Sequence, residues 1–162
     1  MPIIGAFMVP HPPIMLPEVG KGEEKKIQAT TDAYMEVARQ IAELKPETII
    51  ISSPHSIMYA DYFHISPGKS AFGNMGRFSA PQVKFEEEYD TDLVEEICAI
   101  CDSYGAENDS IESLEIQGFP AGTMGERDAD LDHGTMIPLY YIRKKYEGFN
   151  TLSCIPSSLT KF

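Results

Sequence analysis

The sequence is poor in basic residues and contains no long apolar run. Lys and Arg number 13 against 25 Asp and Glu, which gives a formal net charge of −12. Nucleic acids and anionic membranes both need basic patches for binding, so this balance argues against either partner. No run approaches the roughly 18 apolar residues of a membrane span, and the N-terminus has no basic region followed by an apolar stretch. We therefore expect a cytoplasmic protein.

Cysteine is scarce as well, with three residues and no spacing typical of a disulfide framework. This usage favours a reducing compartment. Cys98 and Cys101 form a C-x-x-C pair inside a predicted helix rather than at its start, where a helix dipole would lower a thiol pKa. We expect them to pack in the core. Composition (43% apolar, 23% charged) and a length of 162 residues indicate a single globular domain over residues 1–162.

The hydrophobic pattern predicts an α/β fold. Apolar and β-branched runs predict strands over residues 2–9, 47–53 and 150–155, with weaker candidates over 61–66 and 82–85. Amphipathic spacing predicts helices over residues 22–44, 92–104 and 135–146. Loops are expected over 67–81 and 106–131. The first strand, helix and strand would form a βαβ crossover, which is almost always right-handed. We expect α/β/α layers around a mostly parallel or mixed central sheet.

Two histidines follow the first two main predicted strands. His11 comes after residues 2–9 and His55 after residues 47–53, and prolines flank both. If these strands are parallel neighbours, both imidazoles lie at the carboxyl-end edge of the sheet, where α/β folds place ligands. Two neutral imidazoles would supply two ligands of a three-ligand metal site. The alternative is a pair of ordinary loop histidines.

His133 is the third candidate, in the segment Asp130-Leu-Asp-His-Gly-Thr-Met-Ile-Pro138. It would lie at the N-terminus of the third predicted helix, where the dipole disfavours an imidazolium. Asp130 or Asp132 could instead orient the ring and raise its pKa. Gly134 would leave room for a small molecule. A polar helix cap is the alternative interpretation.

Other chemical candidates carry weaker signals. His64 lies in an alternating strand pattern and is expected to be packed or exposed rather than a ligand. The glycines at 118, 122 and 125 lack the Lys-Ser/Thr ending of a phosphate-binding loop. The run Glu86-Glu-Glu88 is expected to be a solvated turn. Three aromatic residues are candidates to line a pocket, although core packing explains them equally well: Tyr59, Phe63 and Phe119.

Three motifs together resemble the class III extradiol ring-cleavage dioxygenase (LigB-type) family. They are Val9-Pro-His-Pro-Pro13, Ser53-Pro-His55 and Leu131-Asp-His-Gly-Thr-Met-Ile-Pro-Leu139. The likeness runs over essentially the whole chain and looks closest to the dioxygenase-like domain of AmmeMemoRadiSam system proteins, which are relatives of the Memo proteins.

The resemblance implies a non-haem Fe(II) site, with Zn(II) as the other possibility because imidazole suits both. The family's two metal histidines would fall on His11 and His55, and its pocket histidine, close to substrate and oxygen, on His133. The implied reaction is opening of a catecholic aromatic ring beside one hydroxyl group with O2.

The sequence departs from the family at its C-terminal end. The family takes a Glu ligand and an acid–base histidine from a later region, and neither has a counterpart before Phe162. We therefore expect an N-terminal portion with little activity by itself, ending in a truncated or interrupted reading frame. Half of a central sheet would leave an apolar edge uncovered, so a homo-oligomer is expected. The alternatives are an inactive Memo-like module that binds a small molecule or protein, and a zinc-dependent hydrolase whose general base is unidentified.

Overall fold

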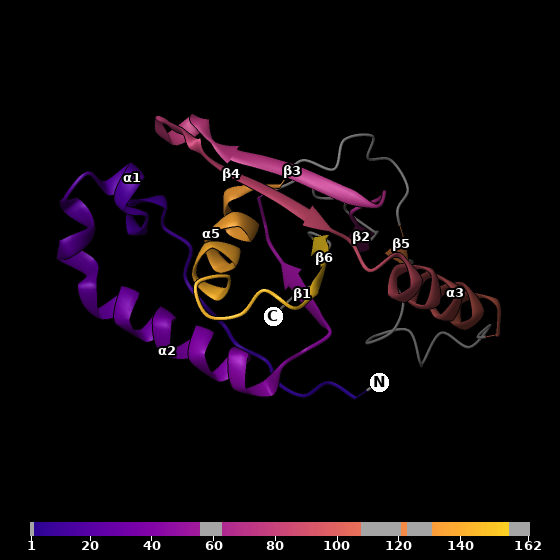
Figure 1. Cartoon of the computed structure of the whole chain (residues 1–162). Helices are drawn as coiled ribbons and strands as arrows, with labels where there is room; N and C mark the ends of the chain where they lie inside the picture. The colour runs from indigo at the N-terminus through magenta and orange to yellow at the C-terminus, as the bar shows by residue number, and fades with distance from the viewer. Residues whose placement is uncertain (1, 56–62, 108–120, 123–130, 156–162) are drawn as a thin grey trace.

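The computed structural model describes residues 2–55, 63–107, 121–122 and 131–155 (Figure 1). Its short 3₁₀ helices are η1 (Pro13–Met15), η2 (Glu23–Ile27) and η3 (Gly76–Phe78). The α-helices are α1 (Pro17–Gly20), α2 (Gln28–Leu44), α3 (Thr91–Glu107) and α5 (His133–Ile142). The strands are β1 (Thr48–Ser52), β2 (Phe63–Ile65), β3 (Ser70–Met75), β4 (Ala80–Glu88), β5 (Ala121–Gly122) and β6 (Asn150–Ile155).

Four strands form a mixed central sheet in the order β1-β6-β2-β5. β1 pairs with β6 in parallel and β2 pairs with β5 in parallel, whereas β2 and β6 are antiparallel. β3 and β4 form a separate antiparallel ribbon. The expected α/β class with a mixed sheet is confirmed.

Helices pack on both faces of the central sheet. Ile51 of β1 belongs to the main core together with Tyr34 of α2 and Ile137 of α5. Ile51 is in register with Ser153 of β6, and successive side chains of a strand alternate between faces. Leu152, the neighbour of Ser153, therefore points to the opposite face, where it packs against residues of α3. Figure 1 shows this arrangement, with α2 and α5 on one side and α3 on the other.

Helix α5 is the centre of the main core. Its residues are buried almost without exception, so no polar face is turned to water. A helix that is apolar all round is one that neighbours cover on every side. The predicted helix over 135–146 is confirmed, but it begins two residues earlier, which makes His133 its first residue.

The predicted strand over residues 2–9 is wrong. This segment has no regular structure and forms no ladder, and Ile3 and Met8 are 89% and 101% exposed. It passes the end of α2, where a Cβ added to Gly5 would lie 2.9 Å from Leu44 Cδ1 (Figure 1). An apolar run is buried only where a helix or sheet covers it. Among the described residues, no helix or strand covers residues 2–9, which are mostly exposed. The βαβ crossover is therefore also wrong, because β1 pairs with β6 instead.

The loop predicted over residues 67–81 is wrong in part. Strand β3 and helix η3 lie within it, and the short strand predicted over 82–85 extends to the nine residues of β4. The run Glu86-Glu-Glu88 belongs to β4 rather than to a solvated turn. Glu87 is only 1% exposed because it faces the core, where it pairs with Arg143.

The remaining predicted elements are confirmed within the described residues. The helix over 22–44 corresponds to η2 and α2, ending at Lys45 in a left-handed conformation. The helix over 92–104 lies inside α3, and the strands over 47–53, 61–66 and 150–155 correspond to β1, β2 and β6. Most of the irregular stretch 106–131 lies outside the described residues. Among those that are described, no helix is both long and apolar enough to cross a membrane.

The pairing of Glu87 with Arg143 provides a stability test of the β4–α5 contact. We expect Glu87→Ala to lower the free energy of unfolding by about 2 kcal/mol, because it leaves a guanidinium without its carboxylate. The value is below that for a fully buried pair, since the Arg143 side chain is 31% exposed. The matched control is Glu88→Ala, at an exposed position on the other face of β4, which should cost under about 0.5 kcal/mol. Equal losses for the two variants in urea unfolding would contradict the assignment.

Candidate metal centre

Three histidines from separate segments meet at one point. His11, His55 and His133 each offer a ring nitrogen, and these nitrogens all lie within 4.8 Å of one another. His11 Nε2 and His55 Nε2 are 2.6 Å apart, and the ring centroids of His55 and His133 are 4.0 Å apart. The expected proximity of His11 and His55 is therefore confirmed, although the strand that was expected to carry His11 does not form.

His55 is positioned by the end of β1. Ser53, one residue past the strand, is 1% exposed, and its backbone N–H donates to the Cys154 carbonyl of β6. The Ser53 hydroxyl donates to Asp132 Oδ1 at 2.7 Å and lies 3.4 Å from the backbone N–H of His55, which donates to it. The loop bearing His55 is thus tied both to the sheet and to the start of α5.

His133 is positioned by the N-terminal cap of α5. Asp132 is the cap residue, and its Oδ1 accepts from the backbone N–H groups of Gly134 at 2.6 Å and Thr135 at 3.2 Å. A side-chain acceptor at this position satisfies N–H groups that have no partner within the helix. The interpretation of this motif as a polar helix cap is confirmed for Asp132, and the cap also directs His133 toward His55.

His11 is positioned by the turn that follows it. The Met15 backbone N–H donates to the Pro12 carbonyl, which closes helix η1, and Met15 and Leu16 are buried. The Tyr141 hydroxyl of α5 donates to the Met15 carbonyl at 2.7 Å. The segment after His11 is therefore fixed to the same helix that begins at His133.

The environment favours neutral imidazoles. Burial lowers the pKa of His11 and of His133 below the ordinary value of 6.5. The positive charge that His55 can carry lowers both pKa values further, whereas the Asp132 carboxylate opposes the shift. From the sequence, the pKa of His133 could be lowered by its surroundings or raised by a neighbouring aspartate. In the structure, desolvation has the largest effect and lowers it. Neutral rings keep the lone pairs that a metal ion requires.

The three imidazoles fit a divalent metal ion. Two ring nitrogens 2.6 Å apart repel through their lone pairs unless a proton or a cation lies between them. Zinc and iron are both commonly bound by imidazole, so the donor set fits either metal. Among the described residues, the cluster contains no carboxylate. Asp132 is close, but its Oδ1 already accepts three hydrogen bonds.

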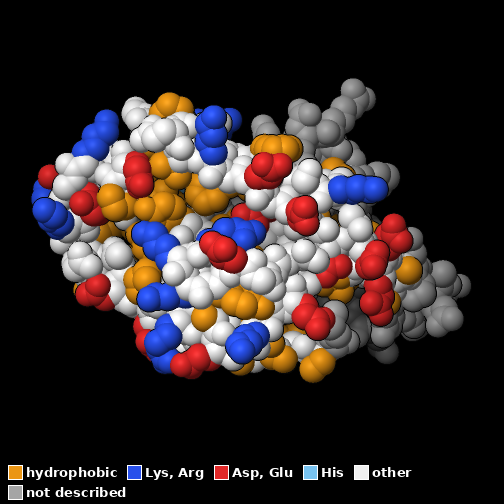
Figure 2. Space-filling view, in the orientation of Figure 1, with side chains coloured by type: hydrophobic (Ala, Val, Ile, Leu, Met, Phe, Trp, Pro, Cys, Tyr) orange, Lys and Arg blue, Asp and Glu red, His pale blue; other side chains and the backbone are white. Residues whose placement is uncertain are grey.

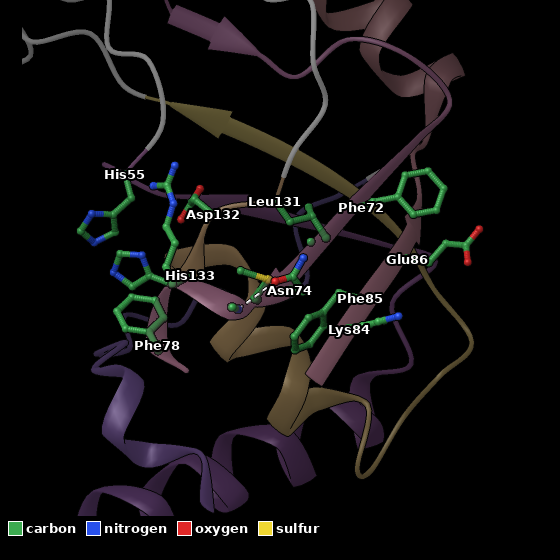
Figure 3. A pocket seen from close by; sticks show the side chains of 14 residues that line it. His55, Phe72, Asn74, Phe78, Lys84, Phe85, Glu86, Leu131, Asp132 and His133 are labelled. Carbon is green, nitrogen blue, oxygen red and sulfur yellow. Dashed lines mark hydrogen bonds between the residues drawn. The ribbon is translucent and has the colours of Figure 1, made fainter. Parts of the chain in front are cut away.

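A cavity of about 1070 Å³ opens beside the histidines. His55 and His133 form one end of its lining, and the β3–β4 ribbon forms much of its wall. The Phe78 ring stands edge-to-face against His133, with centroids 5.2 Å apart. Figure 3 shows these three side chains gathered at one end, with Phe85 and Lys84 toward the other. The cluster therefore adjoins a space large enough for an organic ligand.

Sequence reasoning missed β3 and the full length of β4, of which it predicted only residues 82–85, although one signal for the longer strand was present. Phe85, Glu87 and Tyr89 are buried in alternation, which is the period of a strand with one covered face. Phe63, considered as a pocket residue, packs instead against the α3-side core. The other two candidates, Tyr59 and Phe119, lie outside the described residues.

The residues that were set aside are accounted for where they are described. His64 is completely buried in β2, as expected for a packed histidine. Cys98 packs against the α3-side core. Gly122 lies in β5, whereas Gly118 and Gly125 lie outside the described residues.

Comparison with known proteins identifies relatives of the whole segment. The family described as "Catalytic LigB subunit of aromatic ring-opening dioxygenase" matches residues 5–156. "Protein CA_C1420" of Clostridium acetobutylicum is 35% identical over 167 aligned positions, which cover 99% of this chain and 33% of the relative. The chain thus spans about a third of the length of that relative.

The close packing at Gly134 allows a test of how the histidines are held. A Cβ added there would lie 2.3 Å from Ser53 Oγ and 3.0 Å from His55 Cδ2. Ala is favoured over Gly in a helix by about 1 kcal/mol, but such overpacking costs about 1–3 kcal/mol. We expect Gly134→Ala to destabilise the protein and to weaken Zn(II) binding measured by calorimetry.

The control for this substitution is Gly148→Ala, where the nearest atom would lie 3.3 Å away in the Tyr146 side chain. Zinc affinity and unfolding free energy should both change little in this variant. Unaltered zinc affinity in Gly134→Ala would show that the Ser53–Gly134 contact does not position His55.

Proposed function

Because the chain belongs to the family of catalytic LigB subunits of aromatic ring-opening dioxygenases, we propose that its histidine cluster binds a metal ion for extradiol cleavage of a catecholic ring with O2. One observation carries the proposal. His11, His55 and His133 converge from three segments at the end of a cavity that can hold an aromatic ligand. The convergence involves the three histidines that the family motifs contain.

His11 and His55 are the proposed metal ligands, with Fe(II) as the metal. Their Nε2 atoms are 2.6 Å apart, and burial favours neutral His11 by lowering its pKa. Fe(II), when bound, supplies the redox chemistry that O2 activation needs. Zn(II) fits the same nitrogens and would serve a different, non-redox role.

His133 is the proposed catalytic residue of the pocket. Its lowered pKa keeps a ring nitrogen free to accept the proton of a substrate hydroxyl. The Asp132 cap holds it at the start of α5, and Phe78 packs edge-on against its ring. Phe78 would also help to exclude water from the face on which an aromatic substrate lies.

We propose that residues 1–162 form one LigB-like dioxygenase domain, and that this domain corresponds to the N-terminal portion of the LigB-type protein. The relative is about three times as long as the matched segment. A third ligand would come from an acidic residue, from water or from a neighbouring chain. The free, buried thiol of Cys154 is consistent with a cytoplasmic location.

A second candidate is a Memo-like module that binds a small molecule or protein without catalysis. The observation in its favour is the donor set, because the described cluster holds histidines and no carboxylate. Ferrous oxygenase sites commonly use two histidines and one carboxylate, whereas three histidines also occur in zinc sites. Zinc hydrolysis is less supported, since no general base is identified.

Oxygen consumption separates these functions. We expect Fe(II)-dependent O2 uptake with catechol to be weak for this chain and stronger for the full-length C. acetobutylicum relative. His11→Gln and His55→Gln should abolish both uptake and Fe(II) binding. His133→Gln should reduce uptake by about 100-fold, the typical contribution of a proton-transfer residue, while Fe(II) still binds.

The control is Lys84→Gln, a pocket-lining substitution remote from the histidines in Figure 3, which should leave uptake of O2 with catechol unchanged. Metal binding without O2 uptake by either protein would favour the binding module. Absence of metal binding would contradict the ring-opening function.

We also propose that the chain forms a homo-oligomer. Ile3, Ile4 and Met8 are exposed, and so is Ile50 (52%) of β1, which is an edge strand among the described strands of the sheet. Figure 2 shows further apolar side chains at the surface between α1 and the β3–β4 ribbon, while acidic side chains gather over α3. Open edges and apolar patches favour association.

Light scattering after size-exclusion chromatography tests this proposal. We expect a mass above 18.0 kDa that falls to the monomer value in Ile50→Lys, because a charge on the edge strand opposes pairing. The matched control, Ile100→Lys, places the same charge at another exposed apolar residue, in α3. A monomeric wild-type protein at all concentrations would refute the proposal.

A further inference from the structure

Two hydroxyl oxygens are buried where α2 packs against α5. Thr31 and Tyr34 lie one turn apart on α2, so they share a face of that helix. Both oxygens are buried, and neither has a hydrogen-bond partner among the described residues. The Tyr34 side chain belongs to the main core, and the residue is 3% exposed. Because a buried hydroxyl without a hydrogen bond costs free energy, both oxygens need a partner.

Tyr141 of α5 lies close to both hydroxyls. Its ring centroid is 4.9 Å from that of Tyr34, with the two ring planes 36° apart. Burial raises the pKa of Tyr34, and the neighbouring Tyr141 raises it further. Burial also raises the pKa of Tyr141, and the Thr31 hydroxyl opposes that rise, as a hydrogen-bonding group does at short range. The three oxygens therefore lie in one small region between the two helices.

The hydrogen-bonding capacity of these oxygens suits a small polar guest. The Tyr141 hydroxyl donates to the Met15 carbonyl at 2.7 Å, so its oxygen can still accept a hydrogen bond. Thr31 and Tyr34 can each donate one. Buried water molecules make about three hydrogen bonds to polar groups that have no other partner. Two donors and one acceptor are therefore the set that a single water molecule satisfies.

We infer that Thr31, Tyr34 and Tyr141 form a binding site for one internal water molecule. The water accepts from the Thr31 and Tyr34 hydroxyls and donates to the Tyr141 oxygen, which ties α2 to α5. Since Tyr141 also holds the Met15 carbonyl, the same water fastens α2 to the turn that follows His11. None of the three hydroxyl residues lines the cavity beside the histidines, so the inference does not depend on the ring-opening proposal.

Substitutions that delete a hydroxyl and keep the shape of the side chain test this site. Tyr34→Phe and Thr31→Val each leave the other hydroxyl without its bridging water. We expect each variant to raise the equilibrium constant of unfolding, measured in urea, about 5-fold. The double variant should also raise it about 5-fold, rather than about 25-fold, because both hydroxyls depend on the same water.

The matched control is Thr30→Val, which makes the same change at the neighbouring residue of α2 and should stay within about 2-fold of the wild-type protein. A hydroxyl that binds no water would make Tyr34→Phe neutral or stabilising, because its desolvation cost would disappear. That result would overturn the inference, and so would a double variant whose effect equals the product of the single effects.

A high-resolution crystal structure of the wild-type protein gives the direct readout. We expect ordered density for one water about 2.8 Å from the Thr31, Tyr34 and Tyr141 oxygens. No density between these oxygens would overturn the inference whatever the stability of the variants.

Discussion

The carboxylate of Asp132 holds the site together. It caps the first turn of α5, which begins with His133, and its Oδ1 accepts from the Ser53 hydroxyl beside His55. One side chain therefore links the carboxyl end of β1 to the amino end of a buried helix. Tyr141, two turns further along α5, binds the turn after His11. The three histidines are separate in sequence but are all positioned from this helix.

This arrangement explains why the imidazoles can be neutral and close together in an acidic protein. Among the described residues, Asp132 is the anion that by itself would raise the pKa values of His11 and His133. Desolvation outweighs it, because a partly buried ring loses hydration when it becomes charged. The hydrogen bonds that Asp132 accepts stabilise its charge within the cap. The carboxylate thus acts as a structural anchor, and the lone pairs of the histidines remain available to a metal ion.

Much of the site could be predicted from sequence, because its residues lie in short motifs next to regular elements. The strand over 47–53 and the helix over 135–146 placed His55 and His133 correctly at an element's end and start. The proximity of His11 to His55 was predicted correctly, but the prediction relied on a strand over residues 2–9 that does not form. Residues 2–9 are apolar enough for a strand, but strand formation needs a partner and a covering layer, and neither is a property of the segment itself.

The pocket wall could not be predicted in the same way. Gly, Ser and Asn residues favour loops over 67–81, yet pairing with β4 turns six of these residues into β3. From local sequence, Glu87 is predicted to be a surface charge, because its partner Arg143 lies 56 residues away in sequence. Both errors come from long-range contacts that override local preference. The ribbon they build carries Arg77 and Phe78, so local patterns missed residues that line the cavity beside the histidines.

X-ray absorption spectroscopy of the anaerobic Fe(II)-loaded protein tests the central claim most directly, because it reports the ligands of the metal. The account predicts one ion per chain with imidazole nitrogens at about 2.1 Å, and loss of the ion in His11→Gln and His55→Gln. Bound iron with no imidazole in its first coordination shell, or with a shell unaltered in both variants, would contradict it.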